Sequence, residues 1–257
     1  MPHSASKPVF TGIAVALVTF FDEHGHVDNA ATARHAEHLA GRGVRAVVVA
    51  GTTGEAAHLA IKERLQLFDA VRAAVPTHSP VLLGTGNLAA GVSVTKMTKM
   101  AADHGAAAAL VLSPSRGDVR EFYGEAVAAA GSMPVLGYHN PAVSEPGITM
   151  EELRAVKCHG IKDSTGDAER IIDLVSWYKG WIYTGTATMV TFSGMLGCTG
   201  AILAAANLEP ELCADAFAGS IAAQKALIHA HKIVAHEGVK GIKQELARKF
   251  NTSTACR

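Results

Sequence analysis

The feature that most limits how this chain can fold is a regular alternation of short apolar runs and amphipathic helical patterns. The apolar runs occupy residues 12–20, 46–51, 81–86, 108–113, 135–138, 160–162, 181–185 and 200–206. Short runs that are apolar at nearly every position predict strands buried on both faces, as in a parallel sheet. Helical patterns follow at residues 28–41, 61–75, 89–104, 119–130, 167–177, 188–196, 209–233 and 238–250, and Thr149 opens a further helix through a capping box with Glu152.

Eight strands, each followed by a helix, predict an α/β fold whose sheet closes on itself: a (β/α)8 TIM barrel with a short C-terminal helical extension. The chain of 257 residues has no linker-like segment, and about 250 residues is typical of such a barrel. We therefore expect a single TIM-barrel domain over residues 1–257, with the barrel at 10–207 and the C-terminal helices at 208–250. An open, doubly wound sheet is the competing architecture.

Composition excludes several classes of partner. Lys plus Arg and Asp plus Glu both number 23, so nothing indicates a nucleic-acid or membrane-surface partner. The longest apolar run, at 106–112, is far shorter than the ~20 residues of a membrane-spanning helix. The four cysteines form no C-x-x-C pair, which argues against a zinc site or a disulfide framework. We expect a cytoplasmic protein.

One lysine lies inside a segment that otherwise predicts a buried strand. Lys162 follows Gly160 and Ile161 and precedes Asp163. Burial disfavours the charged form of a lysine and leaves a neutral amine, which can form a Schiff base with a keto substrate. The alternative is a lysine that reaches solvent past the strand end or pairs with Asp163.

Catalytic residues of a closed barrel gather at the carboxyl ends of its strands. Those ends carry Thr52 and Thr53, Asn87, residues 113–116, Tyr138 and His139, Lys162, Gly185 and Thr186, and Asn207. The segment Gly51-Thr52-Thr53-Gly54-Glu55 combines glycines, which let the backbone approach a ligand, with N–H groups that favour a carboxylate. Thr52 and Glu55 also fit a helix capping box, and the two roles are compatible.

Three motifs together resemble a known family. Residues 51–55, Tyr138 followed by Asn140-Pro141, and residues 160–166 fall in the order and spacing of the dihydrodipicolinate synthase/N-acetylneuraminate lyase family. Members of that family are Schiff-base pyruvate aldolases built on a TIM barrel. The resemblance extends from about Phe10 to Phe250.

The resemblance implies a role for each matching residue. Lys162 would form the imine with pyruvate or another 2-oxo acid, Tyr138 would be the general acid/base, and Thr52 would relay its proton. Thr53 and the adjoining backbone would hold the carboxylate. Further candidate substrate-binding residues are Gly51, Gly185 and Ala201. No metal or other cofactor is implied, the second substrate is an aldehyde, and the assembly is a homo-oligomer, a dimer or a tetramer.

Two departures from the family pattern concern the second substrate. The synthase has two tyrosines after the proline of its fourth strand, whereas Pro114 is followed here by Ser115 and Arg116. The arginine that follows the synthase's tyrosine motif is also missing. We therefore expect an altered second-substrate site in which Arg116, with a charged His139, contacts the substrate. Alternatively, Arg116 points to solvent or pairs with Asp118.

Three other interpretations are open. The segment from Gly84 to Ala89 resembles a dinucleotide fingerprint of an oxidoreductase, but the acidic residue that such a site needs, Asp103, precedes the next strand. His35 and His38 are three residues apart rather than four, so we expect surface or helix-end histidines rather than metal ligands. A barrel that binds a 2-oxo acid without turning it over is the third possibility.

Overall fold

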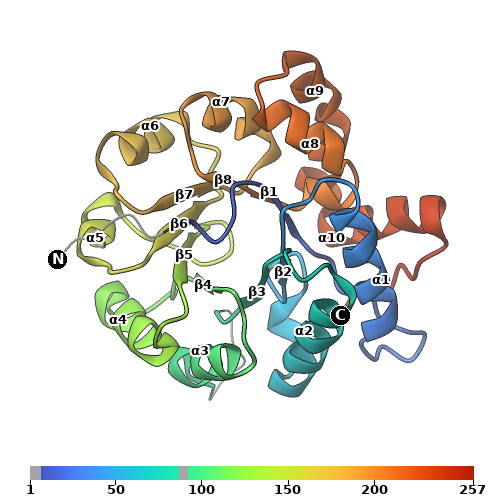
Figure 1. Ribbon diagram of the computed structural model, residues 1–257, viewed down its shortest axis with the longest axis horizontal. Coiled ribbons are helices and arrows are strands. Elements are labelled where there is room, and N and C mark those ends of the chain that lie inside the picture. Colours follow the sequence, from blue (N-terminus) through green and yellow to red (C-terminus); the bar gives the residue numbers. More distant parts are fainter. Residues whose placement is uncertain (1–6, 87–91) are drawn as a thin grey trace.

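Parallel strands close into a barrel, which confirms the fold predicted from the sequence. The strands of this computed structural model are β1 Gly12–Ala16, β2 Ala46–Val49, β3 Val81–Gly84, β4 Ala109–Leu112, β5 Val135–His139, β6 Gly160–Asp163, β7 Trp181–Thr184 and β8 Gly200–Leu203. Each strand pairs with the next, and β8 pairs with β1 to complete the ring (Figure 1). The open-sheet alternative is therefore wrong.

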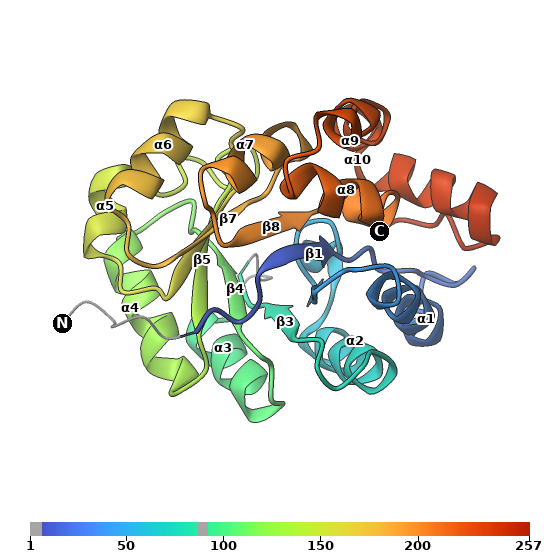
Figure 2. The ribbon, with the colours of Figure 1, turned by 45° about the horizontal axis from the view of Figure 1, so that its top comes forward.

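Helices surround the barrel on the outside (Figures 1 and 2). They are α1 Asn29–Ala40, α2 Ile61–Ala74, α3 Val94–Asp103, α4 Val119–Ala130, α5 Met150–Ala155, α6 Ala168–Trp177, α7 Val190–Met195, α8 Pro210–Phe217, α9 Ile221–Ala226 and α10 Ile228–Phe250. Three short 3-10 helices follow strands: η1 Ala56–His58, η2 Ala187–Met189 and η3 Ala205–Asn207. No helix among the described segments combines the length and apolarity that a bilayer crossing requires.

The structure describes residues 7–86 and 92–257. Asn87, the rest of the fingerprint-like segment to Ala89 and the expected start of the helix at 89–104 lie outside these residues. Within the described part, α3 begins after Ser93, whose hydroxyl accepts a hydrogen bond from the N–H of Lys96. A serine in this position satisfies one of the free N–H groups of the first helical turn.

The C-terminal helices differ most from the expected boundaries. The helix expected at 209–233 is broken into α8, α9 and the start of α10, because Gly219 has φ of 104° and Ser220 caps α9. The helix expected at 238–250 instead continues from Ile228 through a bend at Gly238, where φ is 60° and ψ is −143°. That backbone conformation is accessible to essentially glycine alone.

Two hydrophobic layers define which way each strand residue points. One cluster fills the barrel and includes Ala14, Val48, Leu110, Leu136, Tyr138, Tyr183 and Ile202. The other lies between the strands and the helices and includes Ile13, Val15, Val47, Val111, Ile161 and Ala201. Because successive strand residues alternate between the two faces, this pattern places Tyr138 and Lys162 on the inner side and their neighbours on the outer side.

Candidate active site

Lys162 and Tyr138 come together inside the barrel. They are register partners on the neighbouring strands β6 and β5, and the Lys162 Nζ lies 4.1 Å from the centre of the Tyr138 ring. The Lys162 residue is only 4% exposed. The alternative roles considered for Lys162 are therefore wrong, since its amine neither reaches solvent freely nor pairs with Asp163. The Asp163 carboxylate points outward, where it accepts a hydrogen bond from Thr165 and binds the Arg170 Nε at 2.6 Å.

The Tyr138 hydroxyl lies among groups that favour its ionisation. The side-chain amide of Asn140 donates a hydrogen bond of 2.9 Å to the Tyr138 Oη. Burial by itself raises the pKa of this phenol, but the positive charge of Lys162 and the nearby polar side chains of Ser164, Asn140 and Thr52 outweigh it, so the pKa of Tyr138 is lowered. A tyrosine with a lowered pKa is suited to general acid/base chemistry.

These side chains line a cavity of about 500 Å3 at the carboxyl ends of the strands. It includes Thr52, Thr53, Tyr138, Asn140, Lys162, Ser164 and Gly185. A Cβ atom on Gly185 would collide with the Ser164 hydroxyl and approach the Lys162 Cε to 2.8 Å. A glycine here therefore leaves the room that the lysine side chain occupies.

The loop of Thr52 and Thr53 is not held by the capping box that was expected between Thr52 and Glu55; other contacts hold it. Glu55 adopts a left-handed conformation with φ of 55° and ψ of 37°, and its buried carboxylate binds the Lys243 Nζ at 2.5 Å. Thr19 donates a hydrogen bond of 2.8 Å to the carbonyl of Gly54. The capping role for Thr52 and Glu55 is therefore wrong, and Glu55 ties the loop to α10.

Gly51 lies beside the main cavity rather than in it. Together with Thr52 and Tyr138 it lines a small adjoining cavity of about 10 Å3. Ala201 does not reach either space, because it faces the helix layer from β8. The residues of this segment that do line the main cavity are Ala204 and Ala205, which follow the end of the strand. Ala201 is therefore wrong as a candidate substrate-binding residue, and the residues that line the cavity lie three and four positions later in the chain.

His139 is turned away from the cavity by strand alternation. Its Nδ1 accepts a hydrogen bond of 2.8 Å from the N–H of Ile148, and its side chain lies against Gly147. Burial and the nearby charge of Arg170 lower the pKa of His139 to about 4, against the opposing effect of Asp163. The expectation of a charged His139 in contact with the second substrate is therefore corrected: the imidazole is neutral near pH 7 and faces the helices.

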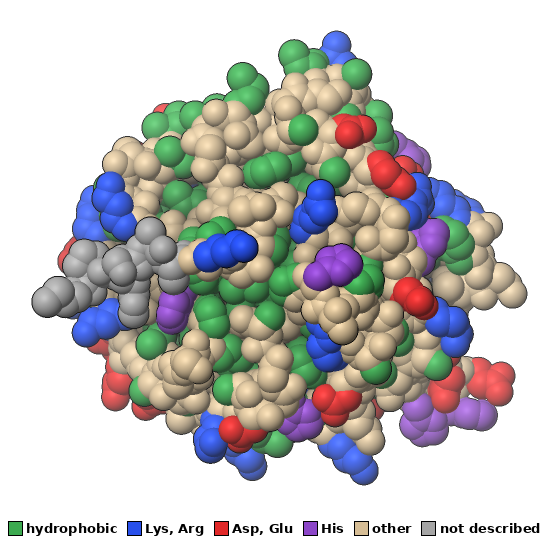
Figure 3. All heavy atoms as spheres, viewed as in Figure 1, with side chains coloured by type: hydrophobic (Ala, Val, Ile, Leu, Met, Phe, Trp, Pro, Cys, Tyr) green, Lys and Arg blue, Asp and Glu red, His purple; other side chains and the backbone are tan. Residues whose placement is uncertain are grey.

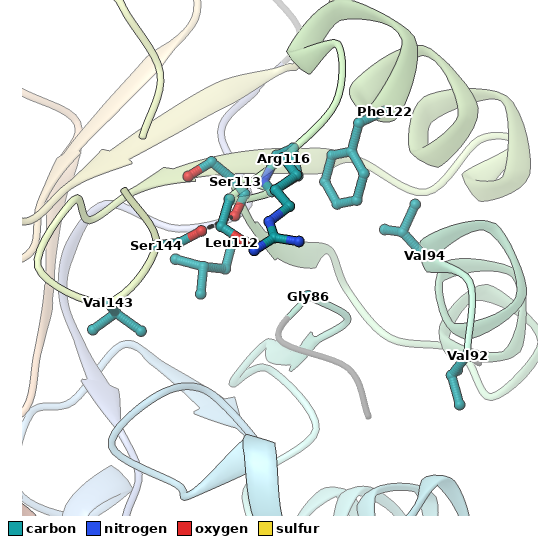
Figure 4. A pocket seen from close by; sticks show the side chains of 11 residues that line it. Gly86, Val92, Val94, Leu112, Ser113, Arg116, Phe122, Val143 and Ser144 are labelled. Atoms are coloured by element: carbon teal, nitrogen blue, oxygen red, sulfur yellow. Dashed lines mark hydrogen bonds between the residues drawn. The ribbon is translucent and has the colours of Figure 1, made fainter. Parts of the chain in front are cut away.

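Arg116 lines a neighbouring cavity of about 340 Å3, and none of the residues around it belongs to the cavity of Lys162. Figure 4 shows its guanidinium directed between Leu112 and Phe122. Asp118 instead caps α4 by accepting hydrogen bonds from the N–H groups of Arg120 and Glu121. The Arg116 residue is exposed to solvent, as one of the two alternatives expected, and the described residues include no ion pair between Arg116 and Asp118.

Comparison with known proteins agrees with this geometry. A sequence model of the Dihydrodipicolinate synthetase family matches residues 9–250. The chain belongs to this family. A 4-hydroxy-tetrahydrodipicolinate synthase from Xylella fastidiosa is 34% identical over 224 residues, covering 81% of this chain and 74% of the relative.

Solved structures of family members share the fold. The dihydrodipicolinate synthase of Acinetobacter baumannii, whose structure contains pyruvate, superimposes with a TM-score of 0.87 and 26% identity over 96% of this chain and 91% of that chain. A sialic acid aldolase from Ruminococcus gnavus has a TM-score of 0.85 with 18% identity, over 97% and 90% of the two chains, which shows a common fold. The expected membership in a family of lyases, which act as carbon–carbon lyases, aldolases or related hydro-lyases, is thereby confirmed.

The interpretations outside the Dihydrodipicolinate synthetase family lose their support. A Cβ atom on Gly84 would collide with the carbonyl of Ala50, so this glycine serves the packing of neighbouring strands. Asp103 ends α3 and pairs with Lys99 at 3.1 Å instead of standing at a strand end. His35 is buried against Phe20, so it is not the surface histidine expected. In keeping with the equal numbers of basic and acidic residues, Figure 3 shows side chains of both charge signs interspersed over one face of the molecule.

Sequence reasoning missed part of the cavity of this family member. Asn140 was recognised only as part of a motif, although it binds the catalytic tyrosine candidate directly. The cavity is also lined by one stripe of α10: His231, Val234, Ala235, Gly238, Val239 and Ile242. Their three- and four-residue spacing marks one helix face, but an apolar stripe alone cannot be distinguished from ordinary core packing.

Proposed function

We propose that this protein is a Schiff-base lyase or aldolase that acts on pyruvate or another 2-oxo acid. The observation that carries the proposal is the buried Lys162 amine stacked at 4.1 Å over the ring of Tyr138, in a cavity that also holds two threonines. A lysine in such an environment can attack a keto carbon and expel water to form an imine. The family membership supports the same chemistry.

The residues of the cavity suffice for each proton transfer. The protonated imine on Lys162 withdraws electrons from the adjacent methyl group, and the Tyr138 phenolate removes a proton from that group to give an enamine. Thr53 and the neighbouring backbone bind the carboxylate of the acid, while Thr52 orients the Tyr138 hydroxyl. The hydrogen bond from Asn140 stabilises the phenolate while the proton is away.

The carbon–carbon bond forms between the enamine carbon and the carbonyl carbon of an aldehyde. The aldehyde oxygen accepts the proton held by Tyr138 and becomes a hydroxyl group, and water then hydrolyses the imine to release the product from Lys162. The reverse sequence cleaves the same bond, so one site serves both directions by microscopic reversibility.

Trapping with borohydride tests the proposal. Incubation with pyruvate and borohydride is expected to add a reduced adduct to the peptide that contains Lys162, and Lys162→Ala is expected to abolish the adduct. Tyr138→Phe should still form the adduct, while turnover falls by about 10²–10⁴ because one acid/base group is lost. Absence of an adduct with every 2-oxo acid tried would refute the proposal. An adduct without turnover of any acceptor would instead favour a non-catalytic 2-oxo acid binding protein.

A further inference from the structure

Helix α10, which lies outside the barrel, contributes one face to the cavity of Lys162. The six residues that line the cavity run from His231 to Ile242 and recur every three or four positions. Val234, Val239 and Ile242 present branched aliphatic side chains there. Ala142, Ala187, Ala204 and Ala205 extend the apolar surface from the barrel side.

Two features hold α10 in this position. The bend at Gly238 falls within the stripe, so residues before and after it line the same cavity. One position beyond Ile242, Lys243 is fully buried and pairs with Glu55 of the threonine loop at 2.5 Å. The apolar face of α10 is thus fixed relative to Thr52 and Thr53.

The charged groups that line the cavity indicate which charge the second substrate can carry. Among the described residues that line it, Lys162 is the only lysine or arginine, and there is no aspartate or glutamate. Once Lys162 carries the imine, its charge lies beside the carboxylate of the 2-oxo acid. A second substrate with its own carboxylate or phosphate would find no further lysine or arginine in this cavity, because Arg116 lines the neighbouring one. A charge taken from water without a partner weakens binding strongly.

We propose that the second substrate is an aldehyde with an apolar aromatic or branched aliphatic body and no anionic group of its own. Val234, Val239 and Ile242 select it by contact with that body. The inference rests on the proposed function and specifies the substrate class of the same site. The bond still forms between the enamine carbon and the aldehyde carbon, and Tyr138 supplies the proton to the new hydroxyl group. His231 offers one hydrogen-bonding group for a neutral polar substituent.

Matched pairs of acceptors test this proposal. With pyruvate as donor, kcat/KM is measured for para-tolualdehyde against para-carboxybenzaldehyde and for isovaleraldehyde against succinic semialdehyde. We expect the apolar member of at least one pair to be preferred by about tenfold or more, the lower end of what a hydrophobic pocket discriminates. Preference for the carboxylated member in both pairs, or equal rates in both, would overturn the proposal.

Variants of α10 connect that preference to its residues. Val239→Ala should lower kcat/KM for the apolar aldehyde by about tenfold, and Val239→Arg should shift the preference toward the carboxylated partner. Ile228→Ala, which truncates an exposed aliphatic residue of α10 outside the cavity, is the matched control and should change neither value. Equal effects of Val239→Ala and Ile228→Ala would overturn the role of the stripe.

The borohydride adduct separates the two proposals. If Lys162 forms the adduct in every variant and the wild type prefers carboxylated aldehydes, only the substrate class is wrong. If no adduct forms with any 2-oxo acid, the proposed function itself fails.

Discussion

Tyr138 and Asn140 show how a local contact adjusts the chemistry of a single residue. The Asn140 amide donates to the Tyr138 Oη at 2.9 Å from only two positions along the chain. A donor at the phenol oxygen favours the ionised form, which is one of the reasons why the pKa of Tyr138 is lowered. We infer that Asn140 is a positioning residue that acts through Tyr138.

Substitution of Asn140 is expected to shift the pH dependence of the reaction. Asn140→Leu removes a donor to the phenolate, so the pKa of Tyr138 should rise, and the pH above which kcat/KM reaches its plateau should rise with it. Asn140→Asp keeps the shape but adds a negative charge, so its shift should be larger in the same direction. The measurements are pH–rate profiles and ultraviolet titration of tyrosine. Profiles that coincide with the wild type in both variants would show that Asn140 has only a structural role.

Arg116 provides a second test at the level of one residue. Because its side chain lines a cavity separate from that of Lys162, Arg116→Ala is expected to leave kcat/KM for pyruvate and for each acceptor within about twofold, as for substitutions worth less than ~0.5 kcal/mol. Steady-state kinetics with charged and neutral aldehydes check this. A loss of more than tenfold confined to anionic acceptors would show instead that Arg116 reaches the second substrate.

Helix α10 and the threonine loop depend on each other through a buried ion pair. The Lys243 Nζ binds the Glu55 carboxylate at 2.5 Å and the carbonyl of Ala255 at 2.6 Å, and it also lies 4.5 Å from the centre of the Phe21 ring. The same carboxylate accepts a hydrogen bond from the N–H of Arg257. The threonine loop, α10 and the C-terminal segment therefore meet at Glu55.

Removing one partner of this pair should destabilise the fold. Lys243→Met leaves the Glu55 carboxylate buried without its cation, and loss of one member of a buried pair typically costs 3–5 kcal/mol, so we expect a decrease of about that size in the free energy of unfolding. The double variant Lys243→Met with Glu55→Gln should recover part of the loss, because no charge is then left unpaired. Urea denaturation measures both, with Lys249→Met as an exposed lysine control on the same helix. Equal stability of Lys243→Met and the control would contradict the assigned role.

At the level of the whole molecule, the C-terminal helices are expected to unfold together with the barrel. The barrel closes through pairing of β8 with β1, and α10 is joined to the β2 end of the ring through Lys243 and Glu55. Breaking either connection exposes the hydrophobic layer that strands and helices share. Because α10 shares this hydrophobic layer with the barrel, we expect the two to open as one cooperative unit.

Two probes can check this expectation. Trp177 and Trp181 lie on α6 and β7, so their fluorescence reports on the barrel side of the molecule, whereas far-ultraviolet circular dichroism reports on all helices, including α8 to α10. We expect the two thermal or urea transitions to coincide. A separate earlier transition in the dichroism signal would show that residues 208–250 form an independent unit, contrary to the single-domain expectation.

The order of the barrel strands and of the helices that follow them could be predicted from the sequence alone, whereas the division of the C-terminal helices could not. Apolar runs that alternate with helical patterns specify a parallel sheet covered by helices, and a lysine within such a run is recognisable because burial of its charge is costly. The convergence of Thr52, Thr53, Tyr138, Lys162 and Gly185 followed from one rule, that parallel strands present their carboxyl ends at the same rim. The structure brings all five to one cavity.

The tertiary structure alone decided which side chains enter that cavity. His139 and Ala201 failed as candidates because side chains alternate across a strand, and a shift of one position turns a residue from the interior to the helix layer. Arg116 lies in the next cavity, a distinction between neighbouring loops that no local pattern records. The ion pair between Lys243 and Glu55 joins residues almost two hundred positions apart, and α10 likewise lines a cavity formed by distant strands. Such contacts form only once the barrel has closed and its first and last segments lie next to each other.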